Sequence, residues 1–77
     1  MIPIPSCTVV TAPVDGRIRR LADEGTDVTA GDVVATVESG GRDIEIRSPK
    51  GGRIAGALAA LTQPVMAGDG VLWLARA

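Results

Sequence analysis

Few residues of this chain have side chains that could carry out covalent or metal chemistry. Cys7 is the single thiol, Lys50 is the single lysine amine, and the chain has no histidine. One thiol and scattered carboxylates make a poor ligand set for a transition metal. Without histidine, the chain also lacks the residue that most often acts as a general acid or base. We therefore expect no metal site, no catalytic residue and no enzymatic activity of the chain's own.

The remaining reactive or bulky side chains have simpler interpretations. We interpret Cys7 as a small buried hydrophobe at a strand start. Only acidic or distant charged groups accompany it in the sequence, which does not favour a reactive thiol. Trp73, the sole aromatic residue, is interpreted as the largest core side chain, with an exposed docking anchor as the alternative. Asp43 and Glu45 alternate on one strand face, which is typical of a solvated surface.

Two runs of alternating polarity, 33–38 and 42–47, meet at Gly40-Gly41 near mid-chain. A two-residue type I′ turn needs positive φ at both central residues, and glycine adopts such angles without steric cost. We therefore expect an exposed β-hairpin tip there. It presents two bare backbone units flanked by the Ser39 hydroxyl and the Arg42 guanidinium.

Length and charge exclude several classes of function. The chain has 77 residues and a net charge of −1, which predicts one small domain without the basic footprint of a nucleic-acid binder. Arg17, Arg19, Arg20 and Arg53 form at most a modest basic patch. We interpret it as ordinary surface, with docking of an acidic partner as the alternative.

The N-terminal segment 1–6 contains two prolines and is expected to be an irregular lead-in to one domain spanning 7–77. It is too short for a signal peptide, and no apolar run approaches the ~20 residues of a membrane helix. A single cysteine suits a reducing compartment. We expect a cytoplasmic protein with no membrane contact.

Most of the chain has the composition of short strands separated by glycine and proline turns. We expect strands over 7–11, 17–21, 33–38, 42–48 and 71–74, with shorter extended segments at Val28, Arg53-Ile54 and Val65. Residues 55–61 are rich in Ala and Leu, which favours one or two helical turns. The sequence therefore predicts an all-β domain with one conflicting segment.

The second half of the sequence repeats the first. Ala12-Pro13…Gly16-Arg17-Ile18 matches Ser48-Pro49…Gly52-Arg53-Ile54 at an offset of 36, and Val28…Gly31-Asp32 matches Val65…Gly68-Asp69 at an offset of 37. Two such halves, about 8–38 and 43–75, cannot each bury an apolar face alone. We expect a two-sheet sandwich with an internal pseudo-two-fold repeat, joined at the hairpin, with both termini at the opposite end.

These motifs, in this order, resemble the biotinyl/lipoyl carrier-domain family. The resemblance covers about Thr8 to Leu74 and includes Glu24-Gly25…Val28…Gly31-Asp32 and the Val37-Glu38 entry to the hairpin. It implies a flattened eight-stranded sandwich of two quasi-symmetric sheets, a barrel-sandwich hybrid. In that family a hairpin lysine is acylated by biotin or lipoate, and the resulting arm moves between active sites.

Aligned on Glu38, the family's acceptor position falls on Gly41, which has no side chain. Arg42 cannot replace the lysine because its guanidinium stays protonated. Lys50 is the only lysine, and it lies about nine residues along the chain beyond the tip, or ~25 Å in an extended strand. We therefore expect no cofactor, unless biotin or lipoate is attached at an atypical residue such as Lys50.

Three functions remain open. The first is a non-covalent docking or assembly module for a carrier-dependent enzyme, such as a carboxylase, an acyltransferase or a 2-oxo acid dehydrogenase. The second is a true carrier modified at Lys50. The third is an adaptor piece of a transport assembly. For the first, we expect the docking hairpin to consist of Glu38, Ser39, Gly40, Gly41 and Arg42.

Overall fold

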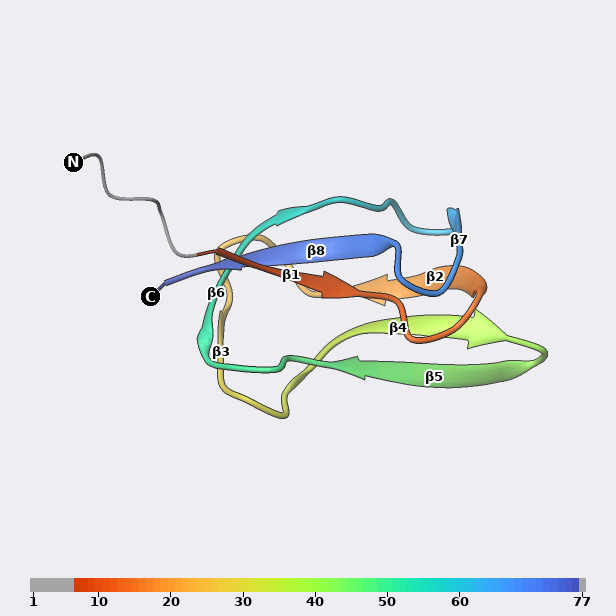
Figure 1. The fold of residues 1–77 in the computed structure, drawn as a ribbon, viewed down its shortest axis with the longest axis horizontal. Coiled ribbons are helices and arrows are strands. Elements are labelled where there is room, and N and C mark those ends of the chain that lie inside the picture. Colours follow the sequence, from red (N-terminus) through yellow and green to blue (C-terminus); the bar gives the residue numbers. More distant parts are fainter. Residues whose placement is uncertain (1–6, 77) are drawn as a thin grey trace.

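The computed structural model describes residues 7–76, which form two four-stranded antiparallel sheets packed face to face (Figure 1). The predicted lead-in, 1–6, lies outside the described residues. The strands are β1 (Cys7–Thr11), β2 (Gly16–Leu21), β3 (Asp27–Val28), β4 (Val33–Ser39), β5 (Arg42–Arg47), β6 (Gly52–Ala57), β7 (Pro64–Val65) and β8 (Gly70–Ala75).

The strand orders are β1-β8-β6-β3 in one sheet, hereafter sheet A, and β5-β4-β2-β7 in the other, sheet B. The two orders correspond strand by strand: β1, β8, β6 and β3 match β5, β4, β2 and β7, and the members of each pair are four strands apart along the chain. The all-β two-sheet prediction is confirmed. The helical turn predicted within 55–61 is wrong: β6 continues to Ala57, because its pairing with β8 overrides the local propensity.

The core lies between the two sheets and is almost wholly aliphatic. Ile18 of β2 and Ile54 of β6 are both buried, 36 residues apart in the sequence. Burying one such side chain contributes about 1.5–3 kcal/mol to folding. The other largest fully buried side chains are Val34, Val37, Val71, Leu72 and Leu74.

Chain entry and exit lie together at one end of the molecule, and the β4–β5 turn lies at the other (Figure 1). Cys7 of β1 and Ala75 of β8 are cross-strand partners. The prediction that the two ends of the domain meet opposite the hairpin is therefore confirmed for the described residues.

Two glycines in the repeated Pro-x-x-Gly motif are required by close strand contact. A Cβ atom on Gly16 would overlap the Glu38 carbonyl oxygen and lie 2.6 Å from Val37 Cγ1. On Gly52 it would lie 2.7 Å from the Ala75 carbonyl oxygen. The motif thus marks the point in each sheet where one strand approaches its neighbour too closely for any side chain.

Backbone hydrogen bonds connect the turns of one half to the proline corners of the other. The Gly31 amide donates to the Ser48 carbonyl at 2.8 Å, and the Ser48 amide donates to the Asp32 carbonyl at 2.8 Å. Both bonds have a counterpart 36 or 37 residues away: Gly68 N to Ala12 O at 2.8 Å and Ala12 N to Asp69 O at 2.9 Å. Each half therefore completes the backbone hydrogen bonding of the other.

Thr62 interrupts this correspondence. Its φ is +66°, and it is the one non-glycine residue with positive φ in the described range. Gly25, 37 residues earlier, has φ +89°. The Thr62 amide donates to the Ile18 carbonyl, and the Gly25 amide donates to the Ile54 carbonyl. A β-branched residue in the left-handed region is strained, so one half carries a cost that the other avoids with glycine.

Two single-residue expectations are corrected by the packing. Cys7 is exposed, because the alternation along edge strand β1 turns it outward together with Val9. Trp73 is half-buried and outside the core cluster. It pairs with Val9 and Gly56 on the outer side of sheet A, where its indole nitrogen lies 2.8 Å from the place of a Gly56 Cβ.

We predict that Gly16→Ala lowers the free energy of unfolding by about 1–3 kcal/mol, because β2 and β4 must separate to admit the methyl group. Thermal unfolding followed by circular dichroism measures the change. Gly51→Ala is the matched control, since its Cβ comes no nearer than 3.5 Å to another atom. An equal loss in both variants would contradict the close-contact explanation.

We predict that Thr62→Gly raises the free energy of unfolding by about 0.5–1 kcal/mol, the net of relieved left-handed strain and increased chain entropy. The reciprocal variant Gly25→Thr, where an added Cβ meets nothing within 4 Å, should lower the free energy of unfolding through backbone strain alone. The midpoint in chemical denaturation tests both; shifts of the same sign would refute the assignment.

Candidate functional site

The β4–β5 hairpin ends in the turn that the sequence predicts. Ser39 and Arg42 are the last paired residues, and Gly40 and Gly41 between them have φ of +59° and +81°. Positive φ at both positions identifies the type I′ geometry, which matches the twist of the strands. A Cβ at either glycine would meet no atom within 4 Å, so the apex is fully open.

Charged residues flank the turn on one side of the hairpin. Glu38 pairs across the sheet with Arg17 of β2 and with Asp43 of β5. Cross-strand partners project from the same face, so these three charges form a row at the outer face of sheet B, one step from the tip. Two carboxylates therefore lie next to each other there, with a single arginine on the β2 side.

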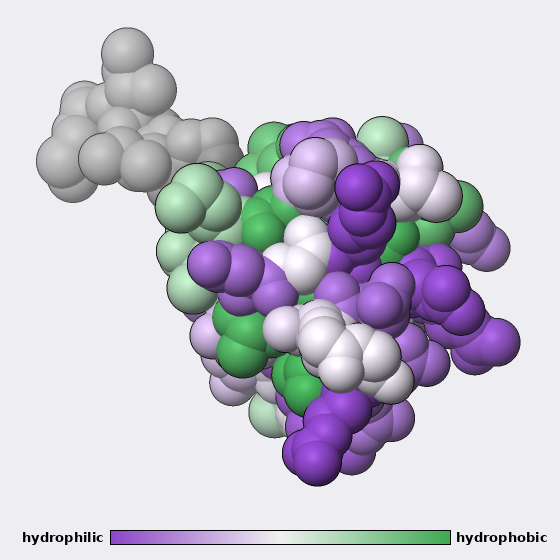
Figure 2. Space-filling view, turned by 90° about the vertical axis from the view of Figure 1, so that its right-hand side faces the viewer, coloured by the Kyte–Doolittle hydropathy of each residue, from purple (hydrophilic) through white to green (hydrophobic). Residues whose placement is uncertain are grey.

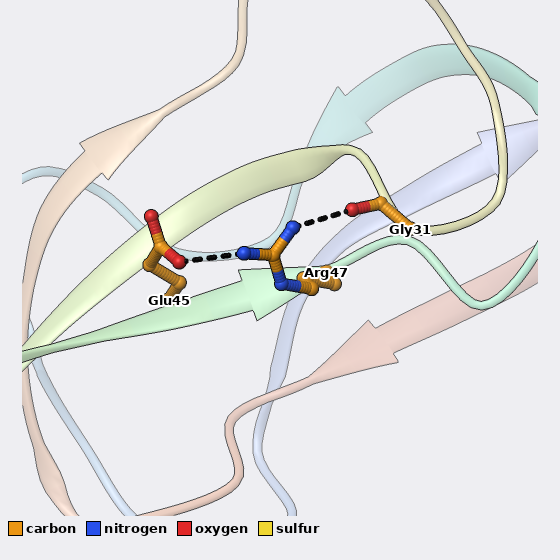
Figure 3. A network of polar contacts seen from close by, with 3 residues as sticks. All are labelled: Gly31, Glu45 and Arg47. Carbon is orange, nitrogen blue, oxygen red and sulfur yellow. Dashed lines mark hydrogen bonds and ion pairs between the residues drawn. The ribbon is translucent and has the colours of Figure 1, made fainter.

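The other end of β5 is held by Arg47 (Figure 3). Its guanidinium donates to Glu45 Oε1 at 2.8 Å and to the Gly31 carbonyl at 2.8 Å. Both charged side chains are more than half exposed, so the ion pair itself contributes little to stability. Its effect is to fix Glu45 and to connect β5 to the turn before β4. The expectation that Asp43 and Glu45 lie on a solvated face is confirmed.

The end of the molecule that carries the turn is mainly hydrophilic, with small apolar areas between the polar side chains (Figure 2). Within residues 7–76, no three His, Cys, Asp or Glu side chains are grouped as a metal ion would require. The described residues also contain no helix that could cross a bilayer. The tip thus presents backbone groups and flanking charges.

Lys50 lies beyond β5, away from the turn. It lines a hollow of about 380 Å³ with Thr8, Ala75 and Arg76, at the end where the chain enters and leaves. The preceding Ser48 is buried and donates its hydroxyl hydrogen to the Lys50 carbonyl. The corner that carries the only lysine is thus fixed by a partly buried hydrogen bond, at the opposite end from the hairpin tip.

The four arginines considered as one basic patch lie on two sheets. Arg17, Arg19 and Arg20 belong to β2 of sheet B, and Arg53 belongs to β6 of sheet A. Arg53 donates to Asp27 at 2.9 Å; this hydrogen bond, and then the charge of Asp27, raise the pKa of the guanidinium above its usual value. The grouping of Arg53 with the others is therefore wrong.

The sequence reasoning missed two features of sheet B. A β-bulge at Arg19 shifts the register between Ile18 and Arg20, and Thr62 reaches the edge of the same face. A run of two arginines in an alternating strand was the only signal of the bulge, and nothing in the local sequence signals the left-handed Thr62 except comparison with Gly25.

Solved structures with the same fold are parts of much larger chains. The domain fits a single-chain, multi-domain long-chain acyl-CoA carboxylase with a TM-score of 0.88 and 25% identity, over 100% of this chain and 8% of that one. It fits the urea carboxylase of Kluyveromyces lactis with a TM-score of 0.84 and 24% identity, over 96% and 7%.

The fold recurs within large carboxylases. A putative efflux transporter from Bacteroides eggerthii also contains it, with a TM-score of 0.80 and 16% identity over 94% of this chain and 40% of that one. No family profile and no curated protein matches the sequence. Because this chain spans less than a tenth of either carboxylase, the likeness establishes the fold, and leaves the function to be argued from the site.

Proposed function

We propose that this chain is a biotinyl/lipoyl-like domain without a modifiable lysine, which acts as a non-covalent docking or assembly module for a carrier-dependent enzyme. The observation that carries the proposal is the apex of the β4–β5 turn. Both apical residues are glycines in open space, at the position where the family resemblance places an acylated amine.

The surroundings of the turn favour a docking function over a chemical one. Ser39 and Arg42 offer a hydroxyl and a guanidinium beside bare backbone, and Glu38 adds a carboxylate one residue further back. A partner can approach glycine backbone more closely than any other residue. We infer that recognition uses the shape of the turn and these three polar groups.

The internal correspondence supports the carrier-type assignment. The strand orders of the two sheets interconvert, and hydrogen bonds recur at offsets of 36 and 37 residues. We infer that the two halves are copies of one motif related by a pseudo-two-fold axis, with the hairpin at their junction. The enzyme partner that suits this architecture is a carboxylase, with an acyltransferase or a 2-oxo acid dehydrogenase as alternatives.

Two other functions have a specific observation in their favour. Lys50 is exposed and could carry an arm at the end opposite the turn. The likeness to a putative efflux transporter fits an adaptor piece of a transport assembly. The first alternative requires a ligase that does not read the hairpin, and the second requires a membrane complex as the partner.

We predict that Gly41→Lys creates a substrate for a biotin or lipoyl ligase, whereas the wild-type chain keeps an unmodified intact mass. Added side-chain atoms meet open space at this position, although a lysine there bears left-handed strain of about 1–2 kcal/mol. Mass spectrometry after incubation with ligase, ATP and cofactor measures the labelled fraction. Arg42→Lys, one residue out of register, is the matched control.

The same measurement on protein purified from its native host tests the absence of an arm. A mass heavier by one biotinyl or lipoyl group, mapped to Lys50 by peptide sequencing, would replace the docking function with the atypical carrier. Labelling of Arg42→Lys as efficient as that of Gly41→Lys would show that the acceptor position is not at residue 41.

We predict that the immobilised chain recovers a carrier-dependent enzyme from host extract and that Arg42→Glu reduces the recovery several-fold, because it replaces the one cation beside the apex. Arg76→Glu makes the same charge change at the other end and should leave recovery unchanged. Quantitative mass spectrometry identifies the partner. Recovery of a membrane transport complex, unaffected by Arg42→Glu, would favour the adaptor function.

A further inference from the structure

The outer face of sheet B contains a wide, open hollow. Its volume is about 860 Å³, and it is bounded by β2, β4, β5 and the segment before β7. Thr36 of β4 lies in its middle row, paired with Arg20 on one side and Glu45 on the other. The hollow therefore lies on the flat side of the hairpin sheet and is separate from the turn.

The bulge in β2 places two arginines in this hollow. Ile18 pairs with Val37 and Arg20 pairs with Thr36, so Arg19 has no partner position in β4. In a regular strand, successive side chains point to opposite faces. Here Arg19 and Arg20 are both exposed and both line the hollow. A β-bulge is a recognised way to redirect a side chain.

Neither arginine is neutralised by the domain itself. Within residues 7–76, the side chains of Arg19 and Arg20 take part in no hydrogen bond or ion pair. The carboxylate of Glu45 on the opposite wall is already occupied by Arg47 at 2.8 Å. Two adjacent, uncompensated cations thus face an open surface, an arrangement that favours an anionic partner.

Among the described residues, unpaired charges of opposite sign line opposite sides of the hollow. Arg19 and Arg20 are on the β2 side, whereas Asp43 is on the β5 side beside Glu38. A nucleic acid presents a continuous row of phosphates, which the acidic side and the net charge of −1 would repel. A bound polypeptide can place its carboxylates over the arginines of β2. It can leave the acidic β5 side uncovered, or place its own lysines or arginines there.

Thr62 supplies an independent sign that this face is more than solvated surface. It lines the same hollow, on the β7 side of β2, and its positive φ is the backbone strain described above. Strained residues persist where the surrounding structure enforces them, and they gather at binding sites. The corresponding position of the other half is Gly25, which adopts positive φ without this strain.

We propose that the outer face of sheet B is a docking surface for an acidic, extended segment of a partner protein, with Arg19 and Arg20 as its principal recognition residues. The proposed surface lies on the same outer face as Glu38 but further from the tip, its lining includes none of residues 38–42, and the proposal does not depend on the function proposed for the turn. The partner's carboxylates would accept charge-assisted hydrogen bonds from the two guanidinium groups.

The test uses a fluorescein-labelled ten-residue peptide of alternating glutamate and alanine, at low ionic strength where screening is weak. Two-dimensional ¹H–¹⁵N spectra of the whole chain should show shifts at Arg19, Arg20, Thr36 and Thr62. Fluorescence anisotropy should show affinity falling roughly tenfold or more in Arg19→Glu/Arg20→Glu. Arg19→Gln/Arg20→Gln, which removes charge without reversing it, should give a smaller loss.

Lys50→Glu/Arg76→Glu is the matched control, with the same charge change at the end where the chain enters and leaves. It should keep the affinity within about twofold after allowance for net charge. Equal losses in both double variants would reduce the binding to unspecific attraction and overturn the proposal. Shifts centred on Lys50, or tighter binding of inorganic phosphate or an oligodeoxynucleotide than of the peptide, would also overturn it.

Discussion

The exchange of backbone hydrogen bonds between the two halves is the interaction on which the rest of the structure depends. Each glycine–aspartate turn donates to, and accepts from, the proline corner of the opposite half, as at Gly31 and Ser48. A buried amide or carbonyl left without a partner is costly. Neither half can therefore satisfy its own corners, and we expect a domain of this size to unfold as one cooperative unit.

The position of the hairpin is fixed by the strands from which it extends. β4 lies between β2 and β5, and Val37 fixes its inner face in the core. The turn thus extends from a strand that is paired on both sides, and its apex contains only Gly40-Gly41. Under the proposed function, the scaffold of a carrier is separable from its chemistry: the strands that would present an attachment point are formed, while Gly41 at the proposed attachment position has no side chain. Interactions at such a tip must come from backbone shape and neighbouring charge.

The main strands and the Gly40-Gly41 turn were predictable because each rests on a local pattern: alternation, or a dipeptide that tolerates positive φ. Features set by register were not. The bulge at Arg19 depends on how β2 aligns with β4, and the strain at Thr62 on a hydrogen bond to a distant strand. Cys7 and Trp73 were misplaced because their strands are apolar on both faces, so alternation could not assign the inner side. The functional role of the tip stays a prediction.

The pairing of Cys7 with Ala75 has a consequence for protein architecture. A unit whose incoming and outgoing strands are direct neighbours can be spliced into a surface loop of a host protein with little separation of the loop's two anchor points. The inserted domain would then project from the host surface, with its two ends at the insertion point and the Gly40-Gly41 turn at the far end. The distance from splice to tip would be set by paired strands and would need no flexible tether.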